Sequence, residues 1–281
     1  MSVGLKTPSD GAVADALGEV YRRLADICEA LAVRVAEPGE GAAGAGVTAA
    51  ALMSDREVLD AFVQAEMTRI QERHGVRVPA HVAASRALHG YAWTLGVLLG
   101  GAWYLERRVP RIRPEDLRLD LDSDTCVITP GAELACLTGD PVGTLPGVLT
   151  LPQEEELRAV LRMSLADHMR PLLVAIGPVV RRRAHALWGM VADDLVSGIW
   201  YLGRMLGEEG AAVRAATDVL PIGIPPYPDG ADFRHLLGEG GRRHMTRTRT
   251  GCCMFYAVRP EEACVTCPRT RDAERLRRLG N

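Results

Sequence analysis

Apolar residues recur at alternating steps of four and three along the start of the chain, which is the spacing of one helical face. This spacing predicts a helix over about 9–37. A glycine- and alanine-rich piece at 37–47 then predicts a loop, because ordering glycine costs much conformational entropy. Ser54 is expected to cap a second helical pattern, which ends at Gly75. The first hundred residues therefore predict helices.

The longest uncharged stretch runs from Ala87 to Leu105, and Pro79 is expected to open the helix that contains it. Its 19 residues reach the lower length limit of a membrane-spanning helix. Gly96 and Gly100 form a pair of small residues that suits close packing in lipid or in a protein core. We favour a buried core helix and expect no stable membrane span, with peripheral association left open.

Prolines and short alternating pieces such as LRLDLD, CVITP and VLTL follow, and they predict short strands near 117–150 in one small sheet or a pair of hairpins. Helical spacing resumes at Gln153, where Pro171 is expected to break or kink the helix, and again over 179–207. A proline-rich loop is expected at 220–230. The predicted fold class is mainly α, or α+β with a small strand region.

Composition changes this picture little. With 281 residues, 47% hydrophobic and 25% charged, the chain can bury a sizeable core, which excludes a disordered or fibrous protein. A formal net charge of −3 argues against a surface built throughout for nucleic acid. No basic segment followed by an apolar core and a cleavage site opens the chain, so we expect a cytoplasmic protein.

Cysteines carry the strongest chemical signal. Four of the seven lie in the last 30 residues and form Cys252-Cys253, ten intervening residues, then Cys264-x-x-Cys267. Four soft thiolates so close together indicate a metal site, because iron and zinc both accept such ligands. Adjacent cysteines diverge, which suits a two-iron cluster better than a zinc knuckle, but zinc, a vicinal disulfide and free thiols stay open.

The same residues carry a family resemblance. Cys252-Cys253 with Tyr256 after the pair, then Cys264 and Cys267-Pro268, resembles the C-terminal signature of the FhuF family of ferric-siderophore reductases. A weaker similarity covers Leu-Trp-Gly at 187–189, where the family usually continues with asparagine and this chain has Met190, and Val-Pro at 109–110. The resemblance implies a 2Fe–2S cluster held by all four cysteines.

One-electron reduction is the chemistry that such a protein would perform. Hard oxygen donors bind Fe(III) strongly and Fe(II) weakly, so reduction would release iron from a siderophore. The resemblance makes hydroxamate siderophores the first class to expect. We therefore predict an oxidoreductase, a ferric-siderophore reductase with no catalytic residue beyond the cluster.

Arginines surround the motif. Residues 242–281 hold ten arginines against four acidic residues, a net +6 that leaves −9 on the rest of the chain. A basic surface suits an acidic electron donor such as a ferredoxin or flavodoxin, but a solvated tail explains the same residues. Few aromatic residues lie there, so nucleic acid is not expected as a partner. Arg247, Arg249 and Tyr256 are candidate substrate- or partner-docking residues.

The expected organisation is a mainly helical siderophore-binding domain over 1–240 and a cluster-binding segment over 241–281.

Two other functions stay open. One is a four-cysteine zinc protein that binds nucleic acid or another protein, and the other is an iron–sulfur redox sensor.

Overall fold

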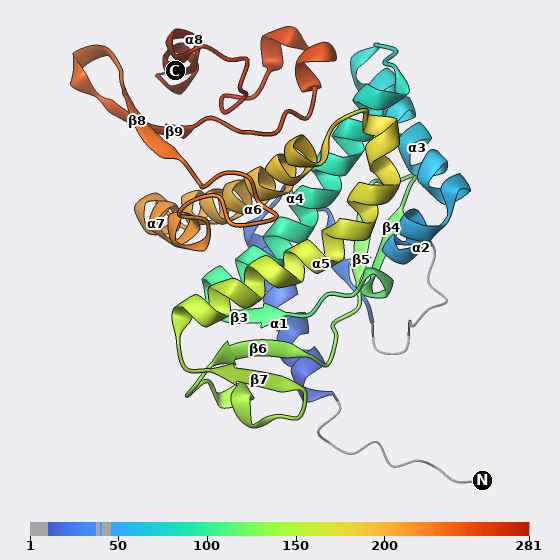
Figure 1. Ribbon diagram of the computed structural model, residues 1–281, viewed down its shortest axis with the longest axis vertical. Helices are drawn as coiled ribbons and strands as arrows, with labels where there is room; N and C mark the ends of the chain where they lie inside the picture. Colours follow the sequence, from blue (N-terminus) through green and yellow to red (C-terminus); the bar gives the residue numbers. More distant parts are fainter. Residues whose placement is uncertain (1–10, 38–39, 41–45, 281) are drawn as a thin grey trace.

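The computed structural model describes residues 11–37, 40 and 46–280 (Figure 1). In this part of the chain the helices are α1 (Ala12–Ile27), α2 (Ala49–Ser54), α3 (Arg56–His74), α4 (Ala80–Glu106), α5 (Glu154–Val180), α6 (Ala184–Met205), α7 (Glu209–Val219) and α8 (Asp272–Leu279). The strands are β1 (Val33–Val35), β2 (Val47–Thr48), β3 (Arg108–Pro110), β4 (Leu117–Asp120), β5 (Thr125–Ile128), β6 (Leu134–Leu137), β7 (Val148–Leu151), β8 (Phe233–Leu237) and β9 (Arg243–Arg247). The predicted fold class, mainly helical with small sheets, is confirmed.

Helix α4 forms the centre of the core and packs against α1, α3, α5 and α6 (Figure 1). Its small residues permit this, since a Cβ on Gly96 would lie 3.2 Å from backbone atoms of Asp194 and Leu195 in α6. The prediction of a buried core helix is confirmed. No helix in the described ranges is long and apolar enough to cross a membrane.

Strands do form near 117–150, but they join partners from elsewhere. One sheet has the order β1-β5-β4-β2, with β1 parallel to β5, and another has the order β3-β6-β7. The predicted helix over 9–37 is therefore too long, because it ends at Ile27 and Val33–Val35 pairs with β5. Alternation revealed the local strands, whereas these pairings between distant segments depend on tertiary contacts.

The ends of the helices were also predicted only in part from local sequence patterns. Helix α5 continues through Pro171 to Val180, because buried residues before and after the proline, such as Met169 and Leu173, keep it packed on the core. Asp55, and not the expected Ser54, caps α3, since the Asp55 side chain accepts two backbone N–H bonds.

The remaining expectations for chain segments have mixed outcomes. The helix expected over 179–207 is observed as α6, and the loop at 220–230 is confirmed. The loop expected at 37–47 lies mostly outside the described residues. Helix α7 and the hairpin β8–β9 were not predicted.

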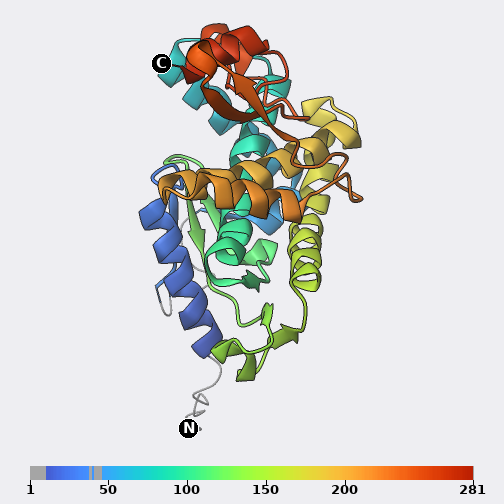
Figure 2. The same cartoon turned by 90° about the vertical axis from the view of Figure 1, so that its left-hand side faces the viewer.

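The C-terminal segment lies at one end of the molecule, far from strands β6 and β7 at the other end (Figure 2). It comprises the hairpin β8–β9, the cysteine-containing loop and α8. Strand β8 precedes residue 240 and pairs with β9 after it, so a division at 240 would separate the two strands of one hairpin.

Candidate metal centre

The four C-terminal cysteines line one small cavity together with Arg249, Phe255 and Tyr256. Cys253 and Cys267 are buried, at 7% and 4% exposure, whereas Cys252 and Cys264 are half-buried. A backbone bond from Cys267 N to Cys264 O, 3.0 Å long, closes the turn that carries the second pair. Both pairs of thiols therefore face the same enclosed space.

Helix α6 supports the first pair of cysteines. A Cβ on Gly251 would lie 2.5 Å from Met190 Cα, so only glycine permits the loop to approach the helix this closely. Gly251 N donates a 2.6 Å hydrogen bond to Asp193 Oδ2, and a Cβ on Gly189 would meet Thr250 Cγ2 at 2.8 Å. The Leu-Trp-Gly segment at 187–189 thus packs beside the cysteine loop, and Met190 is buried there.

Helix α8 supports the second pair. Arg275 is only 2% exposed and donates hydrogen bonds to Val265 O at 2.7 Å and Cys267 O at 2.8 Å. Arg278 donates to Ala263 O. These two arginines hold the cysteine loop, so this part of the basic segment is not a solvated tail.

Two adjacent carboxylates on α6 pair with the arginines that precede the cysteines. Asp193 Oδ1 accepts from Arg247 at 2.6 Å, and Asp194 forms a short ion pair with Arg249. All four side chains are buried. His89 Nδ1 also lies 2.9 Å from Asp194 Oδ2. This buried network fixes β9 and the cysteine loop to the helical core.

Burial and pairing set the protonation states of this network. Burial alone would raise the pKa of Asp194, but Arg249 and His89 outweigh it, and the pKa lies below its usual value. Burial raises the pKa of Asp193 to about 6 despite the two arginines. It also lowers the pKa of His89 in spite of Asp194, so the ring is neutral at neutral pH.

Two of the four cysteines, Cys252 and Cys264, are protonated thiols in the absence of a metal. Burial raises the pKa of Cys264 to about 11 and also raises the pKa of Cys252. Binding a metal must therefore release protons. Within residues 11–37, 40 and 46–280, no group of three or more histidine, cysteine or acidic side chains is arranged to hold a metal ion.

One orphaned donor tests whether the cavity suits an iron–sulfur cluster. Arg249 Nε is buried and has no hydrogen-bond partner among the described residues, since Asp193 Oδ2 lies 3.8 Å away. Arg249 lines the same cavity as the four thiols. Cluster sulfurs accept hydrogen bonds, and such bonds tune the reduction potential. Four thiols around one cavity and a spare N–H donor are the chemical groups that a 2Fe–2S cluster needs, although the four thiols do not converge on one metal ion.

Comparison with known proteins agrees with this chemistry. Residues 249–269 match the family model of the FhuF 2Fe–2S C-terminal domain. This part of the chain is similar to an FhuF-type 2Fe–2S domain. The match includes Arg249 and all four cysteines, and it covers 21 of the 281 residues. A search of curated proteins found no match. The FhuF resemblance and the 2Fe–2S cofactor are thus confirmed, whereas the ligand role of each cysteine stays a prediction.

The candidate docking residues occupy different places. Arg249 and Tyr256 line the cysteine cavity, and the Arg269 guanidinium lies 4.1 Å from the centre of the Tyr256 ring. Arg247 is 1% exposed and bonds to Asp193 and Ala231 O, so the structure gives it a supporting contact away from the cavity.

Sequence reasoning missed the acidic pair Asp193-Asp194. Two adjacent carboxylates inside an apolar helix were a visible signal, because buried charges need partners and arginines at 247 and 249 supply them. Their pairing joins positions 54 and 55 residues apart, which no local pattern reveals.

A second cavity, of about 420 Å³, adjoins the first. Arg249 lines both cavities, and Thr266, which lies between Cys264 and Cys267 in the chain, lines the second. Small-molecule sites typically have volumes of about 300–1,000 Å³. The cysteine cavity therefore has a neighbouring space large enough for a ligand. The residues that line this second cavity are Arg86, His89, Gly90, Trp93, Ser197, Trp200, Tyr201, Arg204, Arg249 and Thr266.

Proposed function

We propose that the chain is a ferric-siderophore reductase that transfers one electron to siderophore-bound Fe(III). The four ligands would be Cys252, Cys253, Cys264 and Cys267. When bound there, the 2Fe–2S cluster supplies a one-electron carrier. The observation that carries the proposal is the shared wall: Arg249 lines both the cysteine cavity and the 420 Å³ cavity beside it.

The chain's own residues would bring the substrate close to the cysteines. A chelate in the second cavity would touch Arg249 and Thr266, and Thr266 Oγ1 lies 4.0 Å from Cys264 Sγ. Electron transfer by this route would need no group other than Thr266 between the chelate and Cys264. The substrate gains one electron and Fe(III) becomes Fe(II), which hard oxygen donors hold weakly. No proton donor or nucleophile is required.

Different parts of the chain would bind the cluster and the substrate. In this proposal the cluster would be held within 241–281, and the part before it, 1–240, would supply most of the walls of the second cavity through α4 and α6, with the hairpin β8–β9 joining the two parts. We place the protein in the cytoplasm, with an acidic electron carrier such as a ferredoxin or flavodoxin as donor. Neither nucleic acid nor a stable membrane span is part of the proposal.

The test uses the purified holoprotein without oxygen. The cluster is reduced with dithionite, excess reductant is removed, and a ferric hydroxamate siderophore is added with a colorimetric Fe(II) trap. We expect the visible absorbance of the oxidised cluster to return while trapped Fe(II) forms in equal amount. The gallium siderophore is the matched control, because gallium(III) accepts no electron.

Two results would refute the proposal. A reducible cluster that no ferric chelate reoxidises would favour a redox sensor. A colourless protein with one bound zinc ion would favour the interaction module instead.

A further inference from the structure

The charge on the wall of the second cavity is of one sign. Arg86, Arg204 and Arg249 line it, and none of the described residues that line it is acidic. The acidic partners of these arginines lie outside that lining: Glu66 is 4.0 Å from Arg86, and Glu209 is 3.9 Å from Arg204. Contacts of this length are weak, so a ligand can compete for both guanidinium groups.

Arg204 is the arginine of this wall that an anionic ligand can reach most easily. Its side chain is 61% exposed and its guanidinium lies 5.8 Å from the centre of the Trp200 ring. Arg249, in contrast, is buried and paired with Asp194. Arg204 can therefore turn toward an anion without breaking the buried network.

Three aromatic side chains, Trp93, Trp200 and Tyr201, form another part of the wall. Trp93 on α4 meets Tyr201 on α6 edge to face, with centroids 5.6 Å apart, and Trp200 packs edge to face on Phe233 at 5.3 Å. Trp200 Nε1 also donates to Glu209 Oε1 at 3.0 Å. These contacts hold the indole rings in place beside the cavity. Fixed aromatic rings and guanidinium groups favour ligands with aromatic faces of their own.

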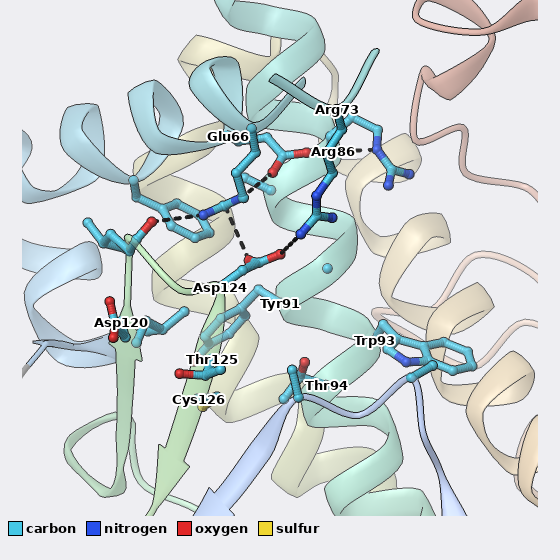
Figure 3. Close-up of a pocket in the computed structure, with 18 residues that line it drawn as sticks. Glu66, Arg73, Arg86, Tyr91, Trp93, Thr94, Asp120, Asp124, Thr125 and Cys126 are labelled. Carbon is cyan, nitrogen blue, oxygen red and sulfur yellow. Dashed lines mark hydrogen bonds and ion pairs between the residues drawn. The ribbon is translucent and has the colours of Figure 1, made fainter. Parts of the chain in front are cut away.

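Three of the residues that line this cavity, Arg86, Gly90 and Trp93, also line another pocket. Figure 3 shows that pocket, with Arg86 and Trp93 labelled. A Cβ on Gly90 would meet nothing within 4 Å, so the helix surface is open there. In this pocket the charges balance, because three acidic residues line it together with three arginines: Glu66, Asp120 and Asp124 with Arg69, Arg73 and Arg86. The open side of Gly90 gives a ligand room to extend, while the wall that contains no acidic residue stays next to Arg249.

We propose that the second cavity selects anionic ferric chelates whose donor groups are aromatic, the catecholate class, over neutral hydroxamate chelates. This inference rests on the proposed function. Three dianionic catecholates leave a trivalent metal with three net negative charges, whereas three monoanionic hydroxamates leave it neutral. Only the first combines negative charge with aromatic faces, which is the chemistry that the arginines, Trp93 and Trp200 complement. This proposal differs from the hydroxamate class that the family resemblance led us to expect, and the two classes are compared in the test.

Binding is tested with gallium(III) chelates, because gallium is not reduced and the result does not depend on electron transfer. Isothermal titration calorimetry compares a hexadentate gallium tris-catecholate with a gallium tris-hydroxamate on the oxidised holoprotein. We expect the tris-catecholate to bind at least about tenfold more tightly, and only its affinity to fall with added salt.

Two variants locate the effect. Arg204→Gln is expected to weaken tris-catecholate binding by roughly fivefold and leave tris-hydroxamate binding unchanged. Arg22→Gln removes an exposed arginine on α1, outside both cavities, and is expected to change neither affinity. Retention of the visible spectrum shows that each variant is folded and loaded.

The outcomes separate this inference from the proposed function. Equal or tighter binding of the tris-hydroxamate, or no effect of Arg204→Gln, would overturn the substrate class and leave reduction standing. Tight, Arg204-dependent binding of the gallium tris-catecholate supports the substrate class. If the reduced protein then reduced neither the ferric tris-catecholate nor the ferric tris-hydroxamate, the proposed reduction would be wrong and the binding site would stand.

Discussion

Alanine in place of Gly251 should displace the loop that carries Cys252 and Cys253. The added Cβ would lie 2.5 Å from Met190 Cα and 2.6 Å from Met190 N, and ordinary contact begins at 3.4 Å. Both Met190 atoms are backbone atoms of α6, so the loop must move away by about 0.9 Å, the difference between 3.4 and 2.5 Å.

That movement also weakens an anchoring bond. The 2.6 Å bond from Gly251 N to Asp193 Oδ2 would lengthen to about 3.5 Å, outside the normal range. A hydrogen bond to a charged group contributes about 1.5–3 kcal/mol, and overpacking alone costs about 1–3 kcal/mol. Together these costs come to at least about 2.5 kcal/mol, and for that loss we expect the melting temperature to fall by roughly 5–10 °C.

The assay measures iron and sulfide per chain, visible absorbance and melting temperature. Gly251→Ala should lose most of its cluster. Gly189→Ala should lose less, because its Cβ meets the Thr250 side chain at 2.8 Å and a side chain can rotate. Gly210→Ala on α7 is the matched control, since its Cβ would meet only the flexible end of Arg214 at 3.7 Å. Full cluster content and unchanged melting in Gly251→Ala would refute this account of how α6 positions the cysteines.

Three further predictions test other parts of the structure. Cys267→Ser should lose or alter the cluster, as measured by iron content and electron paramagnetic resonance. Cys136→Ser is the control and should keep the cluster, because Cys136 is buried between β3 and β7. An unchanged resonance in Cys267→Ser would remove that residue from the ligand set. Asp194→Ala should lower the free energy of unfolding in urea by about 3–5 kcal/mol because it leaves Arg249 buried without its partner, and adding Arg249→Met should recover part of the loss. Burial lowers the pKa of His168, so the folded protein keeps this ring neutral while the unfolded chain binds a proton below about pH 6.5. Stability should therefore fall as the pH drops below about 6.5, by up to about 1.4 kcal/mol per pH unit from this group for as long as the ring stays neutral in the folded protein. His168→Gln should flatten that dependence in urea titrations, and an equally steep fall would contradict the assignment.

Local patterns in the sequence determined much of this protein. Apolar spacing located α3, α4 and α6, alternation located the strands near 117–150, and four closely spaced thiols predicted the cluster domain. These predictions succeeded because side-chain period and ligand spacing are properties of short segments. The interrupted apolar stretch of α4 also favoured a core helix correctly, since glycines such as Gly96 suit close packing on α6.

Only the tertiary structure decided which segments meet. Packing carries α5 through Pro171, pairs β1 with β5, and brings Asp194 against Arg249, 55 residues away along the chain. It also brings Trp93 of α4 and Trp200 of α6 to one cavity beside the cysteines. A sequence pattern shows which face of a segment is buried but not the segment that buries it, because that choice depends on contacts summed over the whole core.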